Sequence, residues 1–196
     1  DGTKGFLRGG QYAVGLALIE EGEVVLGAMA CPNLSDAHRP EAGGPGTLVI
    51  AARGQGAWWQ PLETGGGLRP LRVSERENTA QMRILRSFET GHTNVGRIER
   101  MAAAVGVTAE PVRMDSQAKY ALLASGHAEL LLRLLTSKQP DYRERIWDQA
   151  AGALVTEEAG GRITDLDGKR LDFSAGRMLV NNRGVCASNG RVHDAV

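Results

Sequence analysis

The sequence predicts an α+β protein that becomes α/β in its second half. Short apolar runs separated by turns dominate residues 1–80, which is the pattern of antiparallel hairpins. Strand-like runs alternate with helical periodicities across residues 81–196, which is the pattern of an α/β layer. Glycine is abundant, at 26 of 196 residues, and it gathers at turns. We therefore expect two domains, an α+β region of hairpins over 1–80 and an α/β domain over 81–196.

Apolar runs and turn residues define the elements expected before residue 80. An acidic turn at residues 20–23 separates two apolar runs, and residues 53–54 separate two more, so each pair is predicted to form a hairpin. Trp58 and Trp59 are expected to pack on the sheet of the second hairpin. The predicted elements are strands 11–19 and 24–31, an exposed loop over 35–46, strands 47–52 and 55–60, and a short strand 71–73.

Helical spacing and glycine stops define the elements expected after residue 80. Val95, Ile98 and Met101 share one face of a predicted helix. Gly126 stops a second helix, and a turn at 167–168 divides a strand segment. The predicted elements are strand 82–88, helix 94–105, strand 111–114, helix 116–125, strand 128–135, a helix from 147, a strand and turn over 162–173, a closing strand 178–188 and the start of a helix after 189.

Residues 142–161 are predicted to form a loop and then a helix that stops at Gly160 and Gly161. Small residues at helical spacing give this helix a face that can pack closely. Asp148 falls in its first turn, where a carboxylate interacts favourably with the helix dipole, so the position alone fits a plain helix-start residue. Trp147 before it and the small residues after it favour a carboxylate held in a tight pocket.

The bulk composition limits the classes of function. Lys plus Arg and Asp plus Glu number 23 each, so the formal net charge is zero and bulk binding of nucleic acid is not predicted. Cys31 and Cys186 are too few and too far apart for a disulfide framework, and they predict free thiols in a reducing, cytoplasmic compartment. No apolar run approaches the ~18 residues of a membrane span. A small ligand that needs only local positive charge remains compatible with this composition.

Two motifs at opposite ends of the chain carry a resemblance. The chain starts with Asp1, Gly2 and Thr3, and Trp147 and Asp148 open the sequence Trp-Asp-x-Ala-Ala-Gly. This combination resembles the inositol-monophosphatase-like, lithium-sensitive phosphatases. The longer form Asp-Gly-Thr-Lys-Gly-Phe-Leu-Arg-Gly-Gly-Gln-Tyr is most similar to their 3'(2'),5'-bisphosphate nucleotidase branch, whose members hydrolyse 3'-phosphoadenosine 5'-phosphate (PAP). The similarity extends over essentially the whole chain.

The resemblance implies a layered α-β-α-β-α sandwich of the sugar-phosphatase type, with its active site between two halves. The family motif has Asp-Pro-(Ile/Leu) before the Asp that stands at position 1 here, so we expect a chain that lacks the N-terminal helices and first strands. The branch usually has His after Trp-Asp, where this chain has Gln149. Glutamine can also donate a hydrogen bond, so we expect a modest effect.

Phosphate-ester hydrolysis needs an activated water, cations against the phosphoryl oxygens and donors that hold the phosphate in line. Mg²⁺ is the expected cation, and the resemblance implies Asp1 and Asp148 as its ligands. It also implies that the amides of Gly2 and Thr3 bind phosphate and that the Thr3 hydroxyl contacts the attacking water. Because further family ligands would lie upstream, this chain alone is expected to bind Mg²⁺ weakly and to turn over little.

Five further residues are candidates for substrate contacts. Glu89 and His92 follow a predicted strand; they are either solvated loop residues or, as the resemblance implies, nucleotide contacts, with His92 a hydrogen-bond donor rather than a metal ligand. Ser116 and Lys119 share a helix face near a predicted N-terminus, which is an anion-binding position. Arg133 interrupts a leucine-rich run, so it is either an outward-facing strand residue or a paired charge that reaches a pocket.

The predicted activity is Mg²⁺-dependent hydrolysis of the 3'-phosphate of PAP to give AMP and phosphate, a reaction that belongs to sulfur metabolism. Contacts from Lys119 and Arg133 to the second phosphate would contribute roughly 1.5–3 kcal/mol each, which would explain a preference for a bisphosphate. The resemblance also implies lithium sensitivity. Two alternatives remain: the same chemistry on inositol monophosphate or histidinol phosphate, and a non-catalytic nucleotide-binding module.

Overall fold

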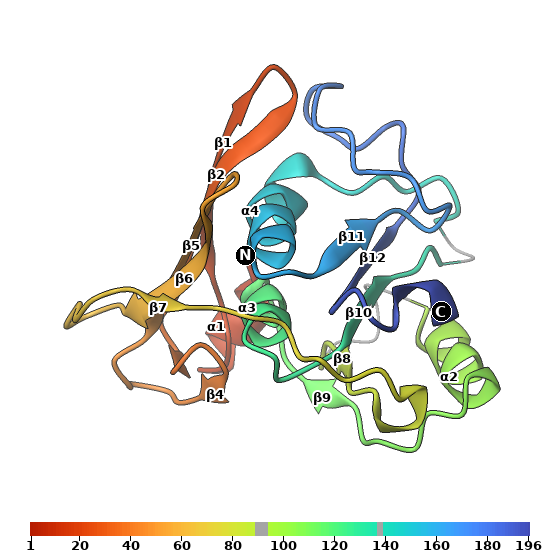
Figure 1. The fold of residues 1–196 in the computed structure, drawn as a ribbon, viewed down its shortest axis with the longest axis horizontal. Helices are drawn as coiled ribbons and strands as arrows, with labels where there is room; N and C mark the ends of the chain where they lie inside the picture. The colour runs from red at the N-terminus through yellow and green to blue at the C-terminus, as the bar shows by residue number, and fades with distance from the viewer. Residues whose placement is uncertain (89–93, 137–138) are drawn as a thin grey trace.

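The computed structural model describes residues 1–88, 94–136 and 139–196, and it contains two five-stranded sheets. The first has the strand order β1-β2-β5-β6-β7 and the second the order β11-β12-β10-β8-β9. Helices α3 and α4 lie between the two sheets, and α2 lies on the other side of the second sheet (Figure 1). The predicted α+β and α/β fold class is confirmed, and the layers run sheet, helix pair, sheet, helix.

Antiparallel neighbours form the whole first sheet, and both predicted hairpins are confirmed. The predicted strand at 71–73 is wrong. Leu71 turns into the core and its amide donates to the Ala57 carbonyl, while the Val73 amide donates to the carbonyl of Ala159, which caps the helix at 146–158. In the loop expected over 35–46, a short antiparallel pairing joins residues 34–35 to residues 39–40. The strands of this half are β1 (Val14–Glu20), β2 (Glu23–Cys31), β3 (Leu34–Ser35), β4 (Arg39–Pro40), β5 (Thr47–Ala52), β6 (Gly56–Pro61) and β7 (Arg69–Pro70).

Mixed pairing characterises the second sheet. Strand β8 pairs in parallel with β9 and β10, whereas β12 pairs antiparallel with β10 and β11. The predicted closing strand 178–188 is too long, because the backbone before residue 185 makes turn and loop bonds instead: the Leu179 amide donates to the Glu144 carbonyl, and the Asn182 amide donates to the Leu179 carbonyl. These strands are β8 (Ile84–Arg86), β9 (Val112–Arg113), β10 (Leu130–Arg133), β11 (Arg162–Thr164) and β12 (Val185–Ser188).

Three predicted helices are present, but one begins late. Ser116 has a left-handed backbone with φ of 61°, so the helix expected over 116–125 starts two residues later. The helix expected after 189 is only a 3₁₀ turn, and the short helix at the start of the chain was not predicted. No helix among the described residues is long and apolar enough to cross a membrane. The helices are α1 (Thr3–Leu7), α2 (Val95–Ala104), α3 (Ala118–Ala124) and α4 (Ile146–Glu158), with 3₁₀ turns η1 (Thr79–Gln81) and η3 (His193–Ala195).

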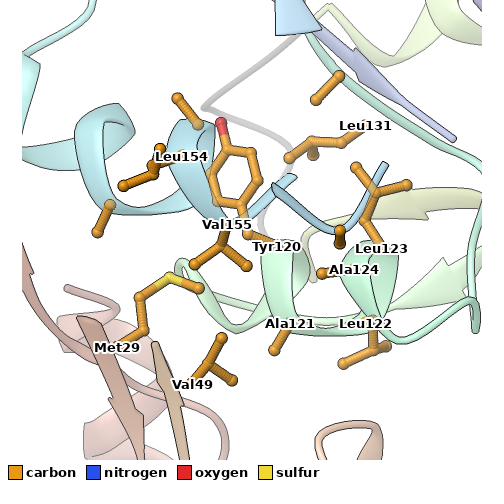
Figure 2. Close-up of a cluster of buried hydrophobic side chains, with 14 of the residues drawn as sticks. Met29, Val49, Tyr120, Ala121, Leu122, Leu123, Ala124, Leu131, Leu154 and Val155 are labelled. Carbon is orange, nitrogen blue, oxygen red and sulfur yellow. The ribbon is translucent and has the colours of Figure 1, made fainter. Parts of the chain in front are cut away.

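The main core lies where α3 and α4 cross between the sheets. Every residue of α3 is buried, and Tyr120 packs beside Leu154 and Val155 of α4, with Met29 of the first sheet nearby (Figure 2). A Cβ at Gly152 would lie only 2.1 Å from the ring of Tyr120. The small-residue face predicted for α4 is therefore confirmed, because it lets the two helices approach closely.

The outer face of the first sheet is apolar and exposed. In β1, Ala17 and Ile19 pack against the core, so Val14, Leu16 and Leu18 point to the opposite face, away from α4. These three side chains are 63%, 67% and 50% exposed, and Leu26, which pairs with Leu18, is 42% exposed. The sheet thus carries apolar residues on both of its faces.

Candidate active site

One cavity of about 430 Å³ collects residues from distant parts of the chain. Helices α1, α3 and α4 all begin beside it, since residues 1–5, 115–120 and 148–149 contribute to its wall. Ser87 after β8, two residues of β10 and Tyr142 in the loop before α4 supply the rest. Its lining consists of Asp1, Gly2, Thr3, Lys4, Gly5, Ser87, Asp115, Ser116, Gln117, Lys119, Tyr120, Leu131, Arg133, Tyr142, Asp148 and Gln149.

Asp1 and Asp148 both line this cavity although 147 positions separate them in the sequence. Asp1 is oriented by the amide of Gln117, which donates to its Oδ2 at 2.6 Å. Burial raises the pKa of the Asp148 carboxyl, and the negative Glu144 raises it further, while Arg133 opposes both effects. A cation beside Asp148 would favour its ionised form and reverse this shift.

The acidic donors suit a hard cation but are few. Carboxylate oxygens are the ligands that Mg²⁺ prefers, and Mg²⁺ keeps several of its waters when bound. Asp1 and Asp148 therefore fit a magnesium ion as a partial set of ligands. Within residues 1–88, 94–136 and 139–196 no group of three or more His, Cys, Asp or Glu side chains is arranged to hold a metal ion.

Gly2 and Thr3 form the start of α1 at the cavity wall. Gly2 has φ of 88°, and a Cβ there would lie 2.7 Å from the Cβ of Ser116. Only glycine fits this combination of left-handed backbone and close approach. The first intrahelical bond runs from the Phe6 amide to the Gly2 carbonyl at 2.9 Å. The amides that precede Phe6 belong to the first turn, whose N–H groups lack acceptors within a helix.

Lys119 is a buried amine in the same wall. Its Nζ donates to the hydroxyl of Ser87 at 3.1 Å. Burial lowers the pKa of Lys119 to about 7, the charge of Arg133 lowers it further, and Asp115 partly offsets both effects. The protonation of this amine therefore changes near neutral pH, and an anion in the cavity would favour the charged form.

Arg133 is a paired charge that reaches the cavity, which decides between the two sequence-based interpretations. Its Nε and Nη2 donate to the Glu144 carboxylate at 3.2 and 3.3 Å. Glu144 also accepts from Nε2 of Gln149 at 2.7 Å, and Oε1 of Gln149 accepts from the hydroxyl of Tyr120. A buried chain of polar groups thus links β10 to both central helices.

Ser116 lines the cavity but does not share a helix face with Lys119, so that part of the prediction is wrong. It precedes the N-cap, Gln117, and its hydroxyl accepts from the Ala118 amide at 3.2 Å. The left-handed backbone of Ser116 is uncommon for a residue other than glycine. Glu89 and His92 lie outside the described residues.

Several lining residues were not predicted. Asp115 is buried, forms an ion pair with Arg8 and accepts from the Phe88 amide at 3.1 Å, so it ties α1 to the end of β8. Ser87 and Tyr142 have no local sequence signal, because isolated serines and tyrosines occur on every kind of surface. The continuation of β8 past its last paired residue was the available clue for Ser87, since strand ends commonly border sites.

The layered fold, with its cavity of carboxylates and cations at the helix starts, belongs to a known class of protein. Residues 1–196 match the inositol monophosphatase family, and the chain belongs to this family. The predicted layered sandwich is therefore confirmed as the fold. The extragenic suppressor protein suhB from Bartonella henselae, a solved structure, superposes with a TM-score of 0.69 at 25% identity, covering 99% of this chain and 64% of the other.

Curated relatives narrow the resemblance to one branch. The chain is 44% identical to the 3'(2'),5'-bisphosphate nucleotidase of Emericella nidulans and covers 59% of that protein's length. It is also 44% identical to the enzyme of the same name from Schizosaccharomyces pombe, of which it covers 56%. Both matches include 100% of this chain. The chain thus spans somewhat more than half the length of these relatives.

Proposed function

We propose that this protein removes the 3'-phosphate of PAP with Mg²⁺ as cofactor, giving AMP and phosphate. The observation that carries the proposal is the meeting of two acidic and two basic side chains in one cavity. Asp1 and Asp148 suit a cation, and Lys119 and Arg133 suit a second anionic group. The 44% identity to two bisphosphate nucleotidases supports the same substrate class.

The residues have distinct proposed roles around the reacting phosphate. Asp1 and Asp148 would hold Mg²⁺, which when bound neutralises charge on the phosphoryl oxygens and makes a water more acidic. The amides of Gly2 and Thr3 donate to the phosphate, as unpaired amides at a helix start commonly do. The Thr3 hydroxyl orients the attacking water. Charge development at the transferred group is thereby stabilised without a covalent intermediate.

The second phosphate is proposed to lie against Lys119 and Arg133. The positive charge of Arg133 lowers the pKa of Lys119, so the two cations lie within electrostatic reach of each other. Two neighbouring cations favour a dianion over a neutral hydroxyl, which supports a nucleoside bisphosphate over an inositol ester. Each charged contact contributes roughly 1.5–3 kcal/mol. We further propose Glu89, His92 and Ser116 as substrate contacts.

The cavity wall draws on both proposed domains. Residues 1–5 belong to the proposed domain 1–80, and the remaining lining residues belong to 81–196. We propose that the active site forms at this boundary. Cys31 and Cys186 are buried as free thiols, which supports the proposed cytoplasmic location.

Substrate competition tests the proposal. The full-length protein is assayed with Mg²⁺ on PAP, on adenosine 3'-monophosphate and on inositol 1-phosphate. We expect kcat/KM for PAP to exceed that for each monophosphate by at least about tenfold, because only PAP engages both cations. A preference for inositol 1-phosphate would refute the assignment of substrate. Binding of PAP without hydrolysis, with all family motifs intact, would instead indicate a nucleotide-binding module.

A further inference from the structure

Glu144 is a buried acid that no proposed catalytic role uses. It is 4% exposed and lies in the segment that leads into α4. Its carboxylate does not belong to the lining of the main cavity, yet it contacts two residues that do, Arg133 and Gln149. A buried carboxylate with ordered partners on two elements has a fixed position.

The contact with Glu144 fixes how the Arg133 guanidinium is presented. Glu144 occupies the edge formed by Nε and Nη2, at 3.2 and 3.3 Å. Arg133 also lines the main cavity, so its side chain reaches that wall while its Nε–Nη2 edge faces Glu144. An arginine without such a partner samples many rotamers, and ordering it costs side-chain entropy. With Glu144 in place, this cost is met during folding.

Gln149 makes the arrangement rigid across three elements. Its amide has one possible orientation, because Nε2 must donate to Glu144 while Oε1 accepts from the Tyr120 hydroxyl. Gln149 follows Asp148 on α4, and Tyr120 follows Lys119 on α3. A chain of buried hydrogen bonds therefore ties Arg133 on β10 to α4 and α3 at the residues that follow Asp148 and Lys119.

We propose that Glu144 is a positioning residue that aligns Arg133 with the second phosphate of the nucleotide. The inference rests on the proposed function, which supplies that phosphate. Glu144 touches neither the phosphate nor the cation; it acts through Arg133. A binding site is effective when supporting residues hold a charged group such as the guanidinium within about 0.5 Å of its productive position.

The test is a double-mutant cycle on the full-length protein. Glu144→Gln and Arg133→Gln are made singly and together, and KM and kcat are measured for PAP and for adenosine 3'-monophosphate, which lacks the second phosphate. Glu144→Gln should raise KM for PAP about tenfold and leave the monophosphate KM within about twofold, while any change in kcat should be the same for both ligands. In the Arg133→Gln background it should add no further loss. Equal effects on both ligands, or fully additive losses, would overturn the inference.

Two further measurements keep the test decisive. Glu144→Asp retains the charge but is one methylene shorter, so a loss of PAP affinity in a variant with unchanged unfolding temperature shows that reach, not charge, matters; an unchanged KM overturns the inference. The ¹⁵N signal of Arg133 Nε–H is recorded without ligand, and it should be protected from exchange in the parent and lose protection in Glu144→Gln. If the parent hydrolyses neither nucleotide, the proposed function fails, while this signal still decides whether Glu144 holds Arg133.

Discussion

At the scale of single residues, Lys119 is expected to make the proposed nucleotide binding dependent on pH. Its pKa is lowered to about 7 in the ligand-free cavity, first by burial and then by the charge of Arg133. A bound phosphate requires the charged amine, so binding takes up a proton once the pH exceeds about 7. The affinity for PAP should therefore fall by up to tenfold per pH unit above about pH 7, until the higher pKa of the bound state is reached.

Calorimetry at several pH values checks this expectation. Lys119→Arg keeps its charge, because arginine does not lose its proton in this range, and should flatten the pH profile. Adenosine 3'-monophosphate serves as the control ligand and should show a shallower dependence. Parallel profiles for the parent and Lys119→Arg would contradict the assignment of the proton to Lys119.

Gln149 is the second residue with a specific expectation. Gln149→Leu keeps the approximate volume but leaves the buried Tyr120 hydroxyl without its acceptor and removes one of the two donors to Glu144 Oε2, the other being Arg133 Nη2. Each such loss costs ~1–3 kcal/mol, so the variant should be less stable by at least that amount. Gln149→His, the residue usual in the related branch, can donate at one ring nitrogen and accept at the other, and should retain more stability. Urea unfolding of the three proteins provides the measurement.

At the scale of elements, the approach of α3 to α4 depends on Gly152. An alanine there would place its Cβ 2.1 Å from the Tyr120 ring, which is too close to accommodate without moving a helix. Gly152→Ala should destabilise the protein by ~1–3 kcal/mol or more. Gly96→Ala in α2 is the matched control, because its nearest neighbours would lie at 3.9 Å and alanine favours helices. Equal stabilities of the two variants would show that the packing can relax.

The elements also show what the sequence predicts well. The α4 helix and both hairpins have strong periodicity and clear turn residues, and they form where expected. The five-residue helix α1 has too few residues for a periodic signal. Ser116 adopts a left-handed backbone where its segment meets Gly2 and Asp1, and Leu71 leaves its strand to enter the core. Both outcomes depend on contacts between distant parts of the chain.

The candidate site follows the same division. Asp1, Gly2, Thr3 and Asp148 were grouped through two motifs, and the structure puts them around one cavity, although their roles stay predictions. Glu144, in contrast, is one of several charged residues in an Arg-rich loop, and no sequence pattern distinguishes it. Its proposed positioning role can be recognised only when Arg133 and Gln149 are brought beside it, because a hydrogen-bond network has no linear signature in the sequence.

At the scale of the whole molecule, the exposed face of the first sheet predicts self-association of this 196-residue chain. Val14, Leu16, Leu18 and Leu26 form a contiguous apolar surface, and such surfaces on monomers generally mark contacts or cause aggregation. Leu16→Lys should reduce association and the binding of a hydrophobic dye, with little loss of stability because this side chain is 67% exposed.

Ala17→Lys is the control for that prediction. Ala17 faces the core from the same strand, so a charge there should unfold the protein rather than reduce its self-association. Light scattering and thermal unfolding separate the two results. If the parent chain is monomeric and binds no dye, the exposed face of the first sheet does not cause self-association and the prediction is wrong.

The convergence of α1, α3 and α4 on one cavity has a thermodynamic consequence. Each helix turns its partially positive end toward the same space, which helps an anion and hinders a lone cation. The proposed magnesium ion and nucleotide are then expected to bind cooperatively, and each should increase the affinity of the protein for the other by the same factor. Such coupling would leave the cavity largely metal-free in the absence of nucleotide and would make the order of addition irrelevant to the final complex.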